Sequence, residues 1–204
     1  PTEAGFIVKI ITSNLRLGIA DYTIMDALAI AFTKSKENRP SLEHAYNVCS
    51  DLGKVAESVA KNGIESLKDF QVEMFSPIRP MLAERVKSPS EAHEKMGKEF
   101  AAEYKLDGER VQIHIQENKI ILYSRSLENI TNYYPDIVEN ISKSLNAKKA
   151  ILEAEVVAIN EDTGEFLPFQ ELMHRRRKYK IAKAVQEYPI TVNFFDILYK
   201  DGNS

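Results

Sequence analysis

Hydrophobic residues recur at helical spacing through roughly the first 75 residues of the chain. Asp21 is a residue type that favours a helix start, and the apolar positions after it follow at i, i+3, i+4 and i+7. These positions are Ile24, Ala27, Leu28 and Ala31. The pattern predicts a helix that begins at Asp21 and has this stripe as its apolar face.

Two more helices are predicted in the same part of the chain. Pro40-Ser41 is typical of a helix start. The apolar stripe that follows is Leu42, Ala45, Tyr46 and Cys49, and we expect the Cys49 thiol to be a small buried apolar group. A third helix is predicted from about Asp51 to Asn62-Gly63, because this pair is a common stop signal.

Prolines at 77, 80 and 89 interrupt the helical period, and a different pattern follows them. Residues 111–116 alternate between Val or Ile and Gln or His, which is the period of a strand with one buried face. Glu117-Asn118-Lys119 then predicts a hairpin turn into a strand over 120–124. We therefore expect a domain boundary between residues 76 and 77.

The remaining elements predict a mixed domain. A helix is expected around 136–145, strands over 151–159 and within 188–199, and a basic helix from about 169 to 186. The last four residues, Asp-Gly-Asn-Ser, are turn formers with no strand after them. The predicted fold class is α+β: a helical module over 1–76, followed by a truncated mixed α/β domain over 77–204.

The composition, with 44% hydrophobic and 28% charged residues, is that of an ordinary globular protein. The net charge of −3 means that any surface for nucleic acid must be local. A single cysteine excludes an internal disulfide and fits a reducing compartment. No stretch approaches the roughly 18 apolar residues of a membrane span, and no signal peptide is visible. We expect a soluble intracellular protein, cytoplasmic in a prokaryote or nuclear in a eukaryote, with no membrane partner.

Lys105 lies in the most unusual stretch of the sequence. If this stretch is a strand, Glu103, Lys105 and Asp107 share one face, and the apolar residues between them share the other. A glycine turn and Arg110 follow at once. A lysine between two carboxylates in this setting suggests an amine that is held for chemistry, although a solvated surface pair is the common alternative.

The usual nucleotide-binding loops are absent from the sequence. It contains neither G-x-x-x-x-G-K-[ST] nor G-x-G-x-x-G, and its four histidines are too scattered for metal-ligand spacing. Another route to nucleotide chemistry is covalent: a lysine amine attacks the α-phosphate and keeps the nucleotide as a phosphoramidate. Lys105 is the candidate for this role.

The six residues from Lys105 to Arg110 match K-x-D-G-x-R. The chain thereby resembles the covalent nucleotidyltransferases: DNA ligases, RNA ligases and mRNA capping enzymes. Later motifs of that family are matched in order and at fitting separations. These are Ser124-Arg125 with Glu128, residues 151–158 and residues 195–199.

Two further segments make the resemblance more specific. Residues 77–83 resemble the entry to the adenylation domain of ATP-dependent DNA ligases, and residues 14–20 resemble part of their helical DNA-binding domain. The resemblance covers nearly the whole chain and is closest to the archaeal and eukaryotic replicative type. It implies that 1–76 is the C-terminal part of the DNA-binding domain and that 77–204 is the first part of the adenylation domain.

The resemblance implies a role for each matching residue. Lys105 resembles the nucleophile that takes AMP from ATP, and its amine must be unprotonated to attack. Glu103 resembles the residue that accepts a hydrogen bond from the adenine amino group. Phe195 resembles the aromatic ring that stacks on adenine, although core packing is its alternative role. Alternation places Phe194 on the other face, so at most one of the two rings is expected to reach the nucleotide.

Arg110 and Arg125 resemble arginines that hold the ribose, the phosphates or the 5′-phosphate of a nick, a task that suits a planar guanidinium. Arg125 could equally be a charge at the rim. Glu155 matches the acidic residue that contacts ribose or assists Mg²⁺. Glu153 shares its strand face, and simple solvation is the alternative role for one of the two; the motif alignment favours Glu155 as the functional residue.

The densest positive run is 174–180, with Lys183 after it. Such a run is often a solvated helix face, but a net-acidic binder of nicked DNA must concentrate its cations somewhere. The candidate contacts to DNA phosphates are Arg175, Arg176, Arg177 and Lys178, with Arg16 and Lys9 of the helical module as weaker candidates.

The implied reaction is the sealing of nicks in duplex DNA through a lysine–AMP intermediate, with ATP and Mg²⁺. Nicked duplex DNA is the implied partner, a sliding clamp is a second one by family analogy, and we expect a monomer. An RNA-directed nucleotidyltransferase and a non-catalytic DNA-binding module are the alternatives. Because later family motifs do not appear, we expect the chain alone to be poorly active or inactive in self-adenylation.

Overall fold

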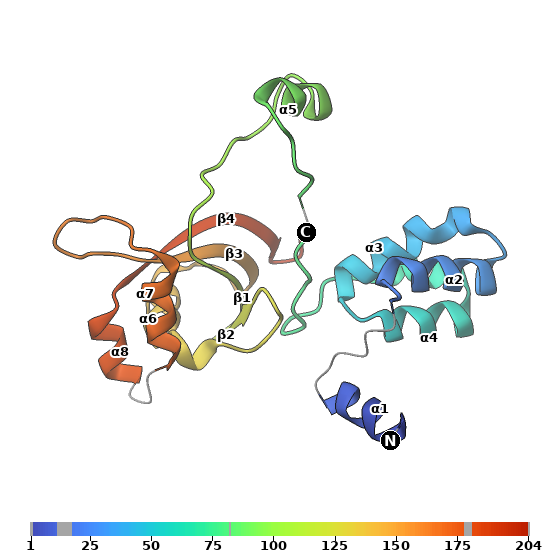
Figure 1. The fold of residues 1–204 in the computed structure, drawn as a ribbon, viewed down its shortest axis with the longest axis horizontal. Coiled ribbons are helices and arrows are strands. Elements are labelled where there is room, and N and C mark those ends of the chain that lie inside the picture. The colour runs from blue at the N-terminus through green and yellow to red at the C-terminus, as the bar shows by residue number, and fades with distance from the viewer. Residues whose placement is uncertain (1, 12–17, 82, 178–180, 204) are drawn as a thin grey trace. The chain divides into compact units, whose positions relative to one another are not determined.

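The computed structural model describes residues 2–11, 18–81, 83–177 and 181–203, and these form two compact units that divide between Gln71 and Val72 (Figure 1). The first unit is helical. It contains α1 (Thr2–Ile11), α2 (Asp21–Thr33), α3 (Arg39–Cys49) and α4 (Leu52–Asn62), with short 3₁₀ helices at Lys36–Asn38 and Ile64–Asp69. No described helix in either unit is long and apolar enough to cross a membrane.

The helical unit confirms two of the predicted helices in detail. Every residue of the stripe expected on α3 is buried in the core of this unit, and burial raises the pKa of the Cys49 thiol. The Asp51 side chain caps α4 by accepting from the Lys54 backbone N–H at 3.0 Å, and Gly63 ends the helix at a positive φ of 78°. Local capping chemistry therefore sets both ends of α4.

The helix predicted from Asp21 is present, but its predicted buried face is wrong. Met25 and Ala29 are the residues of α2 that are buried, whereas Ile24 and Ala31 are exposed. Apolar residues lie all around this helix, so their spacing does not select one face. Asp21 accepts a hydrogen bond from the Tyr46 hydroxyl of α3 at 2.7 Å instead of capping α2 with its side chain.

The second unit is built on a four-stranded antiparallel sheet of order β2-β1-β3-β4. The strands are β1 (Glu109–Gln116), β2 (Lys119–Ser124), β3 (Lys149–Ala158) and β4 (Ile190–Lys200). The helices are α5 (Pro89–Met96), α6 (Pro135–Ser144), α7 (Phe169–Arg177) and α8 (Ile181–Glu187), with a 3₁₀ turn at Thr131–Tyr133. The predicted α+β class, with helices first and the sheet afterwards, is confirmed.

One face of this sheet carries the apolar core. Val111, Ile113 and Ile115 of β1 are buried there beside apolar residues of β3, α6 and α7. The predicted hairpin is confirmed, because Gln116 pairs with Lys119 across a two-residue loop in which Glu117 has a positive φ of 54°. The alternation in β1 therefore leaves its Gln and His side chains on the opposite face.

The strand predicted around Lys105 is wrong. Residues 97–108 have no regular secondary structure, and β1 begins only at Glu109. Residues 101–105 are all exposed, and none of them belongs to a strand ladder of the described chain. Alternation alone cannot form a strand without a partner for its backbone hydrogen bonds.

Candidate active site

The polar face of the sheet is built mainly from β1 and β3. Their register pairs Arg110 with Glu155 and Gln112 with Glu153. Because side chains alternate along a strand, these four residues project from the face opposite the apolar core. The fold thus places two carboxylates, a guanidinium and an amide side by side.

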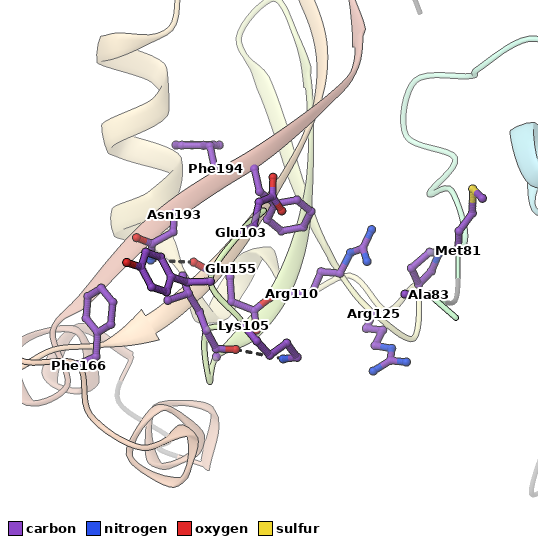
Figure 2. Close-up of a pocket in the computed structure, with 15 residues that line it drawn as sticks. Met81, Ala83, Glu103, Lys105, Arg110, Arg125, Glu155, Phe166, Asn193 and Phe194 are labelled. Atoms are coloured by element: carbon purple, nitrogen blue, oxygen red, sulfur yellow. Dashed lines mark hydrogen bonds between the residues drawn. The ribbon is translucent and has the colours of Figure 1, made fainter. Parts of the chain in front are cut away.

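A cleft of about 960 Å³ opens at this face (Figure 2). Its lining includes all six residues that the sequence analysis linked to the nucleotide: Glu103, Lys105, Arg110, Arg125, Glu155 and Phe195. They come from the irregular segment before β1, from β1, from the turn after β2, and from β3 and β4. The fold therefore gathers these distant sequence positions around one cavity.

Lys105 is exposed at this cleft. Its amine donates to the Leu106 carbonyl at 3.2 Å, a bond that a substrate atom could replace without breaking the fold. The motif residues beside it are fixed by the body of the domain. The Asp107 carboxylate accepts from the Phe169 backbone N–H at the start of α7, at 3.2 Å, and Gly108 passes against the backbone of β3.

Glu155 lies half-buried in the cleft. Desolvation raises the pKa of its carboxyl group, whereas the charges of Lys105 and Arg110 and a hydrogen bond from the Gly108 backbone act in the opposite direction. Asn193 of β4 donates from its side chain to the Glu155 carbonyl at 3.3 Å and lines the same cleft. A carboxylate in this position is oriented toward a cationic group and remains accessible.

Arg110 connects the cleft to the interior of the sheet. Its guanidinium forms an ion pair with Glu153 and lies 5.3 Å from the centre of the Phe195 ring. Its Nε atom is buried and has no hydrogen-bond acceptor among the described residues. Of the two β3 glutamates, Glu153 is only 2% exposed, whereas Glu155 is half-buried and lines the cleft.

A register shift in β4 places Phe195 at the cleft. Phe194 pairs with Ala154, and Asp196 pairs with the preceding residue of β3, Glu153, so Phe195 is an extra residue in the ladder. Strict alternation therefore fails here, and atoms of both rings line the cleft. In Figure 2 the Phe194 side chain extends away from Lys105, and it also lines an apolar hollow beside α6.

Arg125 is presented by a tight turn. The Ser124 backbone N–H donates to the Glu128 carbonyl at 2.9 Å, and Leu127 adopts a positive φ of 66°. This leaves the Arg125 side chain exposed at the edge of the cleft. A cation in this position is available both to a bound nucleotide and to a second phosphate substrate.

The expectation that Arg175 contacts DNA is wrong. Its side chain is 0% exposed, forms an ion pair with Asp136 and donates to the Tyr188 carbonyl at 3.3 Å. Arg176 is only partly exposed and donates to the buried carboxylate of Glu109 at 2.8 Å. Both arginines therefore attach α7 to the rest of the domain, because burying their charges requires carboxylate partners.

The side chains of three other candidates for DNA contact lie outside the described part of the chain. Arg16 and Lys178 lie in the undescribed segments, and only the backbone of Arg177 is described. Lys9 is half-buried in α1.

No group of three or more metal-ligating side chains occurs in the described parts of the chain. At phosphoryl-transfer sites a magnesium ion is usually held by one or two carboxylates and substrate phosphates. Glu155 is the carboxylate that fits, because it is the carboxylate that lines the cleft from the sheet.

Sequence reasoning missed two residues of the polar face. Gln112 is 5% exposed and His114 is 0% exposed, although alternation alone predicts a solvated face. Residues at the start of the second unit cover them, since the Phe75 backbone is hydrogen-bonded to His114 and the Ile78 backbone to Gln112. The available signal was the residue type: Gln and His satisfy buried hydrogen bonds more readily than Lys or Glu.

Comparison with known proteins gives a consistent result. A family model described as ATP dependent DNA ligase domain matches residues 80–204. The DNA ligase of Nitrosopumilus maritimus is 68% identical over 204 residues, which is 100% of this chain and 35% of that protein. The DNA ligase of Cenarchaeum symbiosum is 68% identical over 202 residues, which is 99% of this chain and 34% of that protein. The chain thus spans about a third of the length of the relatives it matches.

The similarity to solved structures is lower, both in sequence identity and in the share of the chain that is covered. A mycobacterial DNA ligase D complexed with ATP and MES covers 50% of this chain and 30% of its own, with 24% identity and a TM-score of 0.36.

Proposed function

The chain belongs to the ATP-dependent DNA ligase family, and we propose that it carries the nucleotide-accepting part of a nick-sealing enzyme, with Lys105 as the nucleophile. The Lys105 amine attacks the α-phosphorus of ATP, a P–N bond forms, and pyrophosphate leaves with the electron pair of the broken P–O bond. An oxygen of the 5′-phosphate at a nick then attacks the same phosphorus, and the P–N bond to Lys105 breaks. Last, the 3′-hydroxyl attacks the 5′-phosphorus and loses its proton, AMP leaves, and the strand is sealed.

The residues around the cleft contact different parts of the nucleotide. Glu103 accepts from the adenine amino group, and Phe195 stacks on the base. Arg110 and Arg125 bind the ribose or phosphates, since guanidinium groups suit bidentate contacts with oxyanions. Both guanidinium side chains line the cleft, which supports this role.

Glu155 is the residue that contacts the ribose or assists magnesium. Bound Mg²⁺ would offset the charge of the phosphates during transfer.

We assign residues 77–204 to the first part of an adenylation domain and residues 1–76 to the C-terminal part of a helical DNA-binding domain. Nicked duplex DNA is the proposed substrate of the whole enzyme, a sliding clamp is a proposed partner by family analogy, and the enzyme acts as a monomer. Lys178, Arg177 and Arg16 remain proposed contacts to DNA phosphates.

The proposal depends on one observation: Lys105 lines the same cleft as both arginines, Glu155 and the Phe195 ring. The test uses a full-length ligase in which this sequence replaces the matching third of the Nitrosopumilus maritimus enzyme. After incubation with α-labelled ATP and magnesium, mass spectrometry should find AMP on the Lys105 peptide. Lys105→Ala should abolish the label, whereas the control Lys98→Ala, in the same irregular segment but outside the cleft lining, should retain it.

Other results would contradict the proposal. Binding of nicked DNA without any adenylation of the full-length enzyme would favour a non-catalytic module, and a preference for RNA ends over nicked DNA would favour an RNA-directed enzyme. The isolated chain is expected to label poorly or not at all, so efficient labelling of it would disprove that part.

A further inference from the structure

A continuous chain of hydrogen bonds crosses the polar face of the sheet. The Phe75 backbone N–H donates to His114 Nδ1 at 3.0 Å, and His114 Nε2–H donates to Gln112 Oε1 at 2.9 Å. The Gln112 amide then donates to Glu153 Oε1 at 3.0 Å, and Glu153 binds Arg110 through its other oxygen. These hydrogen bonds therefore run from Phe75, near the start of the second unit, to a guanidinium in the cleft.

Gln112 is at the centre of these hydrogen bonds, and both the oxygen and the nitrogen of its side-chain amide take part in them. Its Oε1 atom accepts from the Ile78 backbone N–H at 2.7 Å as well as from His114, and its Nε2 atom donates to the Ile78 carbonyl at 3.1 Å as well as to Glu153. Two donors and two acceptors are thus satisfied at a position that is 5% exposed. A residue of another shape or polarity would leave several buried groups unpaired.

The segment that Gln112 holds also reaches the cleft. The Tyr123 hydroxyl donates to the Phe75 carbonyl at 2.8 Å, so both backbone polar groups of Phe75 are bound by side chains of the sheet. Phe75 itself has a positive φ of 67°, a conformation that a phenylalanine adopts only when its surroundings impose it. Pro80 and Met81, which follow shortly after, line the cleft.

We propose that Gln112 is a positioning residue for the adenylation step. It orients Arg110 through Glu153, and its two hydrogen bonds with the Ile78 backbone fix its own amide in the position that this requires. The inference rests on the proposed function, because it concerns how the same cleft is shaped for ATP. Gln112 itself is not among the residues that line the cleft.

The orientation of Arg110 depends on Glu153 carrying its charge in a fixed place. Glu153 is buried and accepts from Gln112 on one oxygen and from Arg110 on the other. Without the Gln112 donor, the carboxylate is free to rotate, and the guanidinium moves with it. Displacement of a substrate-holding group by about 1 Å can lower a rate by up to ~100-fold.

The test is a double-mutant cycle in the full-length ligase that carries this sequence. The second-order rate constant of self-adenylation with ATP is measured for Gln112→Met, for Arg110→Ala and for the double variant, together with each unfolding midpoint. Gln116→Met is the matched control, because Gln116 lies on the same strand and face, outside the cleft lining. Wild-type labelling on Lys105 tests the proposed function independently.

We expect Gln112→Met to lower the rate constant about tenfold and to have little further effect once Arg110 is removed. Equal effects in both backgrounds would overturn the proposal, because a general loss of stability acts independently of Arg110. Unchanged adenylation in Gln112→Met would also overturn it.

Gln112→Glu keeps the test decisive if the methionine variant does not fold. Its carboxyl group can still accept the hydrogen bond from the Ile78 backbone N–H. It can donate to Glu153 only when it is protonated. Its rate relative to wild type should therefore rise as the pH falls. A ratio that does not change with pH in a folded Gln112→Glu variant would count against the hydrogen-bond chain.

Discussion

Gly108 and Val156 approach so closely that no side chain fits between them. A Cβ atom added to Gly108 would lie 2.2 Å from the Val156 carbonyl oxygen and 3.0 Å from Glu155 Cγ. The oxygen belongs to the backbone of β3, which pairs with strands on both sides and cannot move easily. The glycine of the lysine motif is therefore required by packing against the strand that carries Glu155.

The first prediction follows from this contact. Gly108→Ala should destabilise the domain by about 1–3 kcal/mol and should strongly reduce self-adenylation, because the clash displaces both the Lys105 segment and Glu155. Urea unfolding and α-labelled ATP measure the two effects. Gly5→Ala is the control, since Gly5 has nothing within 4 Å in α1 and the helix favours alanine. Equal behaviour of the two variants would show that the contact does not matter.

The second prediction separates stability from activity at Glu155. Burial raises the pKa of this carboxyl group, because the folded protein holds its protonated form more easily than its charged form. The protonated group therefore stabilises the folded state at low pH, and this stabilisation is lost as the pH rises through the pKa of the folded protein. Near neutral pH, Glu155→Gln should therefore increase the free energy of unfolding while it slows adenylation.

Glu161→Gln is the control for this trade-off, because Glu161 is an exposed carboxylate beyond the end of β3. It should change neither quantity. If Glu155→Gln lowered both stability and activity, the carboxylate would have a structural role that the cleft geometry does not suggest.

Elements with their own local signals could be predicted from the sequence. The caps of α4, the hairpin after Gln116 and the buried stripe of α3 each depend on a few neighbouring residues, and each is present. The residues of the cleft were found through family motifs. Their convergence follows from strand register, which no single segment specifies.

The errors share one physical cause, which is dependence on distant partners. Arg175 is one residue in a basic run, and only the fold reveals Asp136 beside it. The irregular segment around Lys105 alternates like a strand but has no backbone partner in the described chain. Gln112 is buried because a segment more than thirty residues away covers it.

The third prediction concerns the corrected role of Arg175. Arg175→Met should lower the free energy of unfolding by about 3 kcal/mol, because it leaves Asp136 without its buried partner. The salt dependence of DNA binding by the full-length enzyme should not change, since this side chain is not exposed. Lys183→Met, at an exposed position of α8, is the control and should cost at most about 0.5 kcal/mol. A shallower salt slope with unchanged stability would restore the DNA-binding role.

The last prediction is a pH dependence that originates at His114. Burial lowers the pKa of this imidazole from 6.5 to about 4. Its Nδ1 atom accepts from the Phe75 backbone, so protonation would remove that bond. Between pH 6.5 and about 4 the unfolded chain binds the extra proton, so stability rises with pH across this window. The contribution is complete above pH 6.5, and at most ~3 kcal/mol is lost by pH 4.

Denaturant unfolding from pH 4 to pH 7.5 tests this assignment. His114→Gln should flatten the profile relative to wild type, because the variant carries no group that titrates at this site. His93→Gln, at an exposed position of α5, should leave the wild-type slope in place. Parallel profiles for wild type and His114→Gln would mean that another group causes the acid sensitivity. The segment from Phe75 to Ile78 would then be held independently of the imidazole charge.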